Sequence, residues 1–233
     1  MNIVITGVSQ GIGLETVLKV AQLGNHTIVG IARNKKALAE LKNKLPNSVF
    51  YGIEFDLSEI FVKGTELVSQ IRQIMPEVNV LINNAGTLIR QPYTEFSAEE
   101  IQALFTINVY APAELMKILS RYMGLTLRAH VVNIGSMAGF QGSSKFSGLS
   151  WYSASKAALI CLTECLSAEY KDKNIAFNCL ALGAVQTDML AKAFPNYKAP
   201  VTPSEMGDYI ANFALTAHNV MNGTVVAVNM SNP

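Results

Sequence analysis

Short apolar runs alternate with longer segments of helical periodicity along the whole chain. Most of the apolar runs are continuous, which is typical of parallel strands that are covered on both faces. The expected strands are Asn2–Thr6, Thr27–Ala32, Val49–Phe55, Val78–Asn83, His130–Ser136, Ala176–Ala181 and Thr224–Val228. The expected helices are Gly13–Leu23, Lys35–Lys44, Ser58–Met75, Ala98–Tyr122, Tyr152–Tyr170 and Ser204–Ala217.

This alternation predicts an α/β fold, a doubly wound parallel sheet of about seven strands with helices on both faces. No linker, low-complexity tract or internal repeat divides the 233 residues, so we expect a single domain over residues 1–233. In such a sheet, ligands bind beyond the carboxyl ends of the strands. The residues that follow the strands are therefore the first candidates for chemistry.

Composition narrows the classes of partner. The net charge of +1 argues against a general affinity for nucleic acid or for anionic membranes. No apolar run is long enough to cross a bilayer, and the first residues form a strand, so we expect a cytoplasmic protein. Cys161, Cys165 and Cys179 lack the spacing of a disulfide framework and are expected to be packing residues. They have no further ligands nearby, so no metal site is expected.

A glycine-rich loop joins the first strand to the first helix. Glycines permit a tight turn and let backbone amides approach a pyrophosphate, which the helix N-terminus also attracts. The spacing G-x-x-x-G-x-G is a weak signal alone, but its place between strand and helix indicates a dinucleotide site. The residues expected to contact the cofactor are Gly7, Ser9, Gln10, Gly11, Ile12 and Gly13.

Arg33 follows the second strand and bears on the choice of cofactor. A carboxylate at that strand end would bind a ribose 2′-hydroxyl, whereas this chain has Ala32 and then Arg33. A guanidinium matches a phosphate dianion, which favours NADP(H) over NAD(H). The alternative is a solvated arginine at a helix start, and Gln10 offers no second basic contact to the phosphate.

Tyr152 and Lys156 lie four residues apart at the start of an expected helix, so their side chains share one face. A tyrosine with an ordinary pKa is a poor acid–base catalyst near neutrality, and a nearby ammonium lowers that pKa. The pair therefore indicates a general acid tuned by its neighbour. The alternative is an exposed helix pair, because this spacing is common.

Two more polar residues favour the catalytic interpretation of Tyr152 and Lys156 over an exposed helix pair. Ser136 ends the preceding strand, where its hydroxyl can hold a substrate carbonyl oxygen in line with the tyrosine. Asn108 lies in an apolar helical stretch, where its amide must find partners.

These motifs, in their order and approximate spacing, resemble the classical short-chain dehydrogenase/reductase family over essentially the whole chain, and in particular its 3-oxoacyl-ACP-reductase-like and sepiapterin-reductase-like members. The resemblance implies a Rossmann fold and a catalytic tetrad of Asn108, Ser136, Tyr152 and Lys156. In it Tyr152 donates the proton, Ser136 orients the substrate oxygen and Asn108 holds a water, while Lys156 binds the nicotinamide ribose and lowers the Tyr152 pKa. It also implies cofactor contacts from Asp56, Leu57, Asn83, Ala85, Gly86, Tyr152, Lys156, Gly183, Val185 and Thr187.

The sequence departs from the family pattern near the expected substrate loop, residues 184–203. Leu182 replaces the usual proline before Gly183, and this change predicts a looser start of the loop. The interval from Ser136 to Tyr152 is longer than usual, while the lid region is short. The last residues, Val228–Pro233, lack the paired glycines often found in ketoacyl-forming members.

The function expected from these features is an NADP(H)-dependent oxidoreductase that acts on a small carbonyl or alcohol substrate. The alternative is a non-catalytic dinucleotide-binding regulatory protein, which a degraded tetrad would favour. A sugar-nucleotide epimerase is disfavoured because the chain has no room for the larger C-terminal region. The resemblance further suggests a homodimer or homotetramer, since the helix Tyr152–Tyr170 is apolar around much of its circumference. The alternative is burial of that helix within the monomer alone.

Overall fold

The computed structural model describes residues 1–45 and 49–230. Seven parallel strands form one sheet in the order β3-β2-β1-β4-β5-β6-β7, which confirms the doubly wound α/β fold. The strands are β1 (Asn2–Thr6), β2 (Thr27–Ala32), β3 (Val49–Glu54), β4 (Val80–Asn83), β5 (Ala129–Ser136), β6 (Ile175–Leu182) and β7 (Val225–Val228). The order reverses between β1 and β4, so a crevice opens beyond their carboxyl ends.

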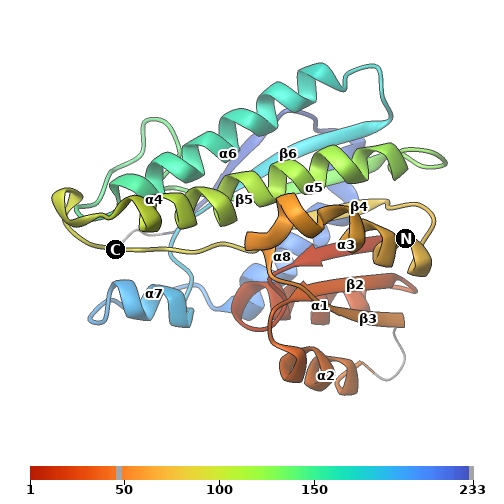
Figure 1. The fold of residues 1–233 in the computed structure, drawn as a ribbon, viewed down its shortest axis with the longest axis horizontal. Coiled ribbons are helices and arrows are strands. Elements are labelled where there is room, and N and C mark those ends of the chain that lie inside the picture. The colour runs from red at the N-terminus through yellow and green to blue at the C-terminus, as the bar shows by residue number, and fades with distance from the viewer. Residues whose placement is uncertain (46–48, 231–233) are drawn as a thin grey trace.

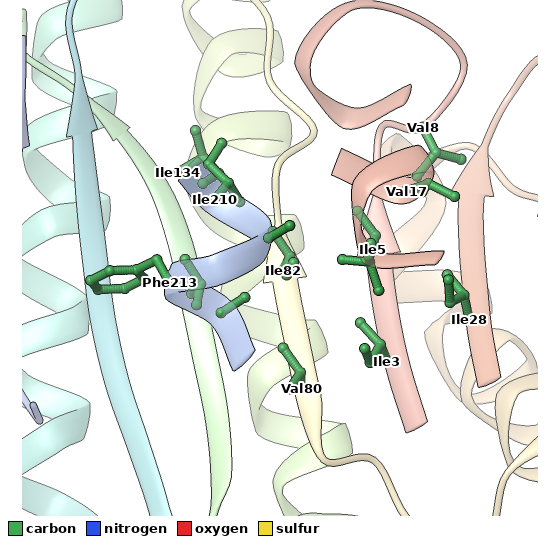
Figure 2. Packing of buried hydrophobic residues seen from close by; sticks show 14 of the residues in the cluster. Ile3, Ile5, Val8, Val17, Ile28, Val80, Ile82, Ile134, Ile210 and Phe213 are labelled. Atoms are coloured by element: carbon green, nitrogen blue, oxygen red, sulfur yellow. The ribbon is translucent and has the colours of Figure 1, made fainter. Parts of the chain in front are cut away.

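Helices cover both faces of the sheet (Figure 1). One layer holds α1 (Gly11–Gln22), α2 (Lys35–Asn43) and α8 (Pro203–Thr216), and the other holds α3 (Ile60–Ile74), α5 (Ala111–Leu119) and α6 (Ser150–Glu169). Figure 2 shows strand side chains such as Ile82 and Ile134 facing Ile210 and Phe213 of α8. The first and last of these helices, α1 and α8, pack directly against each other.

The helix expected over Ala98–Tyr122 is divided into segments. It consists of α4 (Ala98–Phe105), a π-helical stretch η3 (Thr106–Tyr110), α5 and the 3₁₀ turn η4 (Ser120–Tyr122). Pro112, in the first turn of α5, has no N–H to donate to the carbonyl of Asn108 four residues earlier, and a wider turn accommodates this gap. Asn108 therefore lies in the π-helical stretch.

Other boundaries shift for local reasons. The helix expected from Ser58 begins as the 3₁₀ turn η1 (Leu57–Glu59), with Asp56 as its cap, before α3. Two further 3₁₀ turns are η2 (Tyr93–Glu95) and η5 (Ala217–Asn219). A short helix that the sequence pattern did not reveal, α7 (Asp188–Ala193), forms inside the expected substrate loop. Figure 1 shows α7 (light blue) apart from the sheet, on the side opposite the N-terminus.

Candidate active site

A cleft of about 1240 Å³ opens at the carboxyl edge of the sheet, lined by the segments that follow β1 to β6. It brings together almost all residues expected from the sequence. Those that line it are Gly7, Ser9, Gln10, Gly11, Ile12, Gly13, Arg33, Asp56, Leu57, Ala85, Gly86, Ser136, Tyr152, Lys156, Gly183, Val185 and Thr187. Asn83 and Asn108 are buried behind its wall.

The glycine loop has the geometry of an anion site. Gly7 and Gly11 have φ angles of +73° and +58°, which favour glycine. A Cβ on Gly13 would collide with the Gly7 carbonyl oxygen and with the side chain of Asn84, so only glycine lets α1 lie this close to β1. Helix α1 has no side-chain cap at Gln10 and no acidic residue in its first turn. Its first N–H groups are thus available to an anion, as a pyrophosphate requires.

Two residues that the sequence analysis did not assign to the site hold this loop in place. The Asn84 side chain donates hydrogen bonds of 3.0 and 3.2 Å to the carbonyl oxygens of Thr6 and Gly7. The Thr6 hydroxyl accepts from the backbone N–H groups of Asn84 (3.1 Å) and Ala85 (3.0 Å). The position of Asn84 directly after a buried strand was the signal for this role.

Asn83, in contrast, does not face the cleft. Its side chain donates a 2.8 Å hydrogen bond to Asn133, which donates to the Thr163 hydroxyl at 2.9 Å. All three residues are buried, so this chain of hydrogen bonds joins the centre of the sheet to α6. Strand alternation turns the Asn83 side chain away from the cleft, and a contact of Asn83 with a cofactor stays a prediction.

Arg33 reaches the mouth of the cleft with its side chain 78% exposed, and one guanidinium nitrogen lies 3.9 Å from the Asp56 carboxylate. Asp56 also accepts a 2.9 Å hydrogen bond from the N–H of Ser58 and so caps η1. An exposed pair at this distance contributes little to stability. The guanidinium is therefore free to turn toward a phosphate in the cleft.

Ser136, Tyr152 and Lys156 line the other part of the cleft, at the end of β5 and the start of α6. The Lys156 ammonium donates a 2.8 Å hydrogen bond to the carbonyl of Ile134 and has further donors available. Burial lowers the pKa of Lys156 to about 8. Burial also raises the pKa of Tyr152 above its ordinary value, while hydrogen bonding with Ser136 acts in the lowering direction.

The expectation that Lys156 depresses the Tyr152 pKa is therefore not met in this structure. The reason is desolvation, which disfavours both the phenolate and the ammonium and is the largest cause of both pKa shifts. The phenol is held in its protonated form, which is the form that a proton donor needs.

Asn108 lies behind this group at the π-helical stretch, 1% exposed. Its amide donates to the carbonyl of Thr87 at 2.9 Å and to the hydroxyl of Ser155 at 3.0 Å, and its oxygen accepts from the N–H of Thr87 at 2.9 Å. Both amide hydrogens are thus engaged within the protein. Ser155, which the sequence analysis did not assign, lies one residue before Lys156 and is fully buried.

The segment after β6 closes the cleft. Gly183 donates a 2.9 Å hydrogen bond to Val228, Val185 pairs with Val201, and the Thr187 hydroxyl caps α7 by accepting from Leu190 at 3.2 Å. Leu182, which replaces the family's proline, is the last residue of β6, and its carbonyl accepts from Met137 at 2.8 Å. Both neighbours of this strand pair with its last residues, and a looser start of the loop stays a prediction.

The cysteines differ from expectation in part. Cys179 is buried, but Cys161 and Cys165 are exposed, because they lie on the face of α6 that points away from the sheet. Within residues 1–45 and 49–230, no group of three or more His, Cys, Asp or Glu side chains could hold a metal ion. Over the same ranges, no helix combines the length and the apolar character needed to cross a membrane.

Known proteins share this arrangement. The model of the family described as short chain dehydrogenase matches residues 1–198. A relative named ketoacyl reductase HetN, from a Nostoc species, is 32% identical over 191 residues, which cover 81% of this chain and 65% of that protein. A relative named L-xylulose reductase, from Caenorhabditis elegans, is 31% identical over 189 residues, which cover 81% of this chain and 73% of that protein.

A solved structure has the same fold. A short chain dehydrogenase from Burkholderia cenocepacia, in complex with NADP, superposes with a TM-score of 0.84 at 22% identity and covers 97% of this chain and 95% of that chain. The ordered motifs, the seven-stranded sheet and the family match over residues 1–198 agree. The chain belongs to the short-chain dehydrogenase/reductase family of oxidoreductases.

Proposed function

We propose that this protein is an NADP(H)-dependent reductase of a carbonyl compound, or a dehydrogenase of the matching secondary alcohol, with Tyr152 as the general acid and base. The observation that carries the proposal is the convergence of Ser136, Tyr152 and Lys156 on the cleft that also holds the glycine loop. An uncapped helix N-terminus lies in one part of this cleft and a protonated phenol in another.

The residues of the cleft have distinct roles in this mechanism. The nicotinamide group, when bound, supplies or accepts the hydride. Ser136 donates a hydrogen bond to the substrate oxygen and so holds it beside Tyr152. In reduction the Tyr152 hydroxyl gives its proton to that oxygen, and in oxidation the phenolate takes a proton from the alcohol. Lys156 binds the nicotinamide ribose with its free donors.

Asn108 acts in this mechanism by position. Its side chain joins the segment that lines the cofactor side of the cleft, at Thr87, to the helix that carries Tyr152, at Ser155. A water held by Asn108 remains part of the family-based expectation. The proposed cofactor contacts are those named above from Gly7 to Thr187, with Asn83 acting behind the wall rather than in it.

The preference for NADP(H) rests on Arg33 and on the lack of a carboxylate at the end of β2. Ala32 cannot accept from a ribose 2′-hydroxyl, and Arg33 can pair with a 2′-phosphate. Solved structures of the same fold are described with NADP and with NADH, so the preference rests on these residues of the chain itself.

The proposed assembly is a homodimer or homotetramer. Helix α6 buries Ser155, Lys156, Leu159, Ile160 and Thr163 within the monomer, and it leaves a second face with Cys161 and Cys165 exposed. Light scattering at micromolar concentration tests the assembly, and a monomer there contradicts it.

Reduction of a panel of ketones, aldehydes and ketoacyl thioesters, followed by NADPH absorbance, tests the catalytic proposal. Tyr152→Phe keeps the ring and removes the proton, so we expect turnover to fall roughly 10²- to 10⁴-fold while NADPH still binds. Tyr51→Phe, an exposed tyrosine on β3, is the matched control. Unchanged turnover in Tyr152→Phe contradicts the mechanism and favours a non-catalytic dinucleotide-binding protein.

A further inference from the structure

One wall of the cleft near Ser136 and Tyr152 is apolar. Met137 directly follows Ser136, and Leu149 lies three residues before Tyr152. Both line the cleft together with Phe146, Leu190 and Phe194. The rings of Phe146 and Phe194 meet edge to face, with centroids 6.4 Å apart and an interplanar angle of 79°. Two loops that are distant in sequence thus form one aromatic wall.

Arg90 contacts both segments of this wall. Its Nη1 donates a 2.7 Å hydrogen bond to the carbonyl of Ala193, the last residue of α7. Its guanidinium lies over the Phe194 ring, 4.3 Å from the centroid. Its Nε donates to the carbonyl of Ser147 at 3.5 Å, close to Phe146. One side chain therefore holds α7, the Phe194 ring and the loop before α6 together.

Two polar side chains near this wall, those of Gln186 and Lys145, are engaged with the protein's own backbone. The Gln186 side-chain oxygen accepts from the N–H of Ala199 at 2.8 Å. The Lys145 ammonium donates to the carbonyls of Ala138 (3.0 Å) and Phe140 (2.7 Å). Along the aromatic wall itself, the hydroxyl groups of a sugar would exchange water for few partners, which disfavours a polyhydroxylated group on that side.

We propose that the substrate carries an apolar, ring-sized group next to its carbonyl, and that Arg90 sets this selectivity by holding Phe194 against Phe146. The proposal rests on the reductase function proposed above. Arg90 is a positioning residue in it, because it acts on the substrate through Phe194. A guanidinium suits this task, since its planar fork can donate to two carbonyls while its face covers a ring.

Steady-state reduction of acetophenone, butan-2-one and xylulose with NADPH tests the proposal in the full-length protein. The wild type is expected to prefer acetophenone to xylulose by at least about tenfold in kcat/KM. Phe194→Ala and Arg90→Ala should raise the KM for acetophenone about tenfold, with kcat changed less than about threefold and butan-2-one little affected. Arg90→Lys keeps the charge without the fork and should recover part of the loss.

Arg72→Ala is the matched control for general effects of losing a stacked arginine. Arg72 covers the Tyr122 ring at 4.1 Å and does not line the cleft. It should lower thermal stability as much as Arg90→Ala without changing the ratio of the three substrates.

The outcomes distinguish a failure of the substrate-class proposal from a failure of the proposed reductase function. Equal or better use of xylulose by the wild type, or an equal loss for all substrates in Arg90→Ala, overturns the proposal about substrate class alone. NADPH binding, followed by energy transfer from the sole tryptophan, Trp151, with no turnover of any carbonyl overturns the reductase function and this proposal with it.

Discussion

The side-chain amide of Asn108 donates a 3.0 Å hydrogen bond to the Ser155 hydroxyl, which donates a 2.7 Å bond to the carbonyl of Tyr152. Asn108 also exchanges two hydrogen bonds with the backbone of Thr87. A buried, fully bonded network of this kind rigidifies the groups that it joins. The network therefore couples the loop after β4 to the start of α6, which carries Tyr152 and Lys156.

Replacing Ser155 by alanine should weaken this coupling. The change leaves one hydrogen of the Asn108 amide unpaired in a buried site, which costs about 1–3 kcal/mol of unfolding free energy. We expect a kcat lowered roughly tenfold, with the affinity for NADPH nearly unchanged. Urea unfolding and steady-state kinetics measure the two effects. Ser153→Ala, on the same helix, is the control, and an equal effect in both variants contradicts the positioning role.

The two directions of the reaction should respond oppositely to pH. Reduction needs the protonated Tyr152, and burial raises its pKa, so the reductive kcat should persist through neutrality. Oxidation needs the phenolate, so its kcat should rise with pH toward the alkaline range. The pKa of Lys156 is about 8, so its charge is lost above that pH and the reductive rate should decline there. Rates measured from pH 6 to 10 test this, and an oxidative rate that falls between pH 7 and 9 contradicts it.

Replacing Arg33 by alanine should weaken NADPH selectively. Charge-assisted bonds to a phosphate are worth about 1.5–3 kcal/mol, so the KM for NADPH should rise roughly 10- to 100-fold while the KM for NADH changes little. Lys35→Ala is the control, because its exposed side chain pairs only at 4.0 Å with Glu54. A wild-type kcat/KM for NADH that equals or exceeds the value for NADPH contradicts the NADP assignment.

His130 should make the protein less stable in mild acid. It is fully buried between the carbonyl of Ala214 and the side chain of Asn178, each at 2.9 Å, and burial lowers its pKa from 6.5 to about 4. Between these two values the unfolded chain binds the proton and the folded chain does not, so stability falls as the pH falls from 6.5 to 4. The full loss is roughly 3 kcal/mol, from about 1.4 kcal/mol per pKa unit.

Urea unfolding at several pH values between 4 and 7 measures this slope. His130→Gln removes the titrating group and should flatten the curve, even if the variant is less stable at every pH. His218→Gln should flatten it less, because the His218 pKa is also lowered by burial but the residue is less enclosed. An unchanged slope in His130→Gln contradicts the assignment.

The fold could be predicted because its signals are local and repeated. Continuous apolar runs marked every strand, and the Thr202/Glu205 capping box with Pro203 marks the start of α8 in the sequence itself. Helix α7 was not predicted because its six residues carry too few apolar positions to show a helical period. The division of the helix expected over Ala98–Tyr122 was not predicted, because the sequence shows Pro112 but not how the backbone adapts to it.

Among the site residues, those whose roles have local causes could be predicted, and those whose roles depend on distant partners could not. Tyr152, Lys156 and the glycine loop could be predicted from spacing within one segment. Ser155 and Arg90 could not, because their roles depend on partners 47 and 103 residues away. The Tyr152 pKa was predicted in the wrong direction because spacing shows the neighbouring charge and not the degree of burial.

Because α1 packs against α8, the proposed cofactor site forms in two stages during synthesis of the chain. The glycine loop and α1 are synthesised well before α8, the helix from Pro203 onward that packs against α1. At Gly207 an added Cβ would lie 2.8 Å from the backbone of Glu15, so this contact is close. A nascent chain that stops before α8 leaves the α8-facing side of α1 in water, so the proposed dinucleotide site is completed only once α8 has been made.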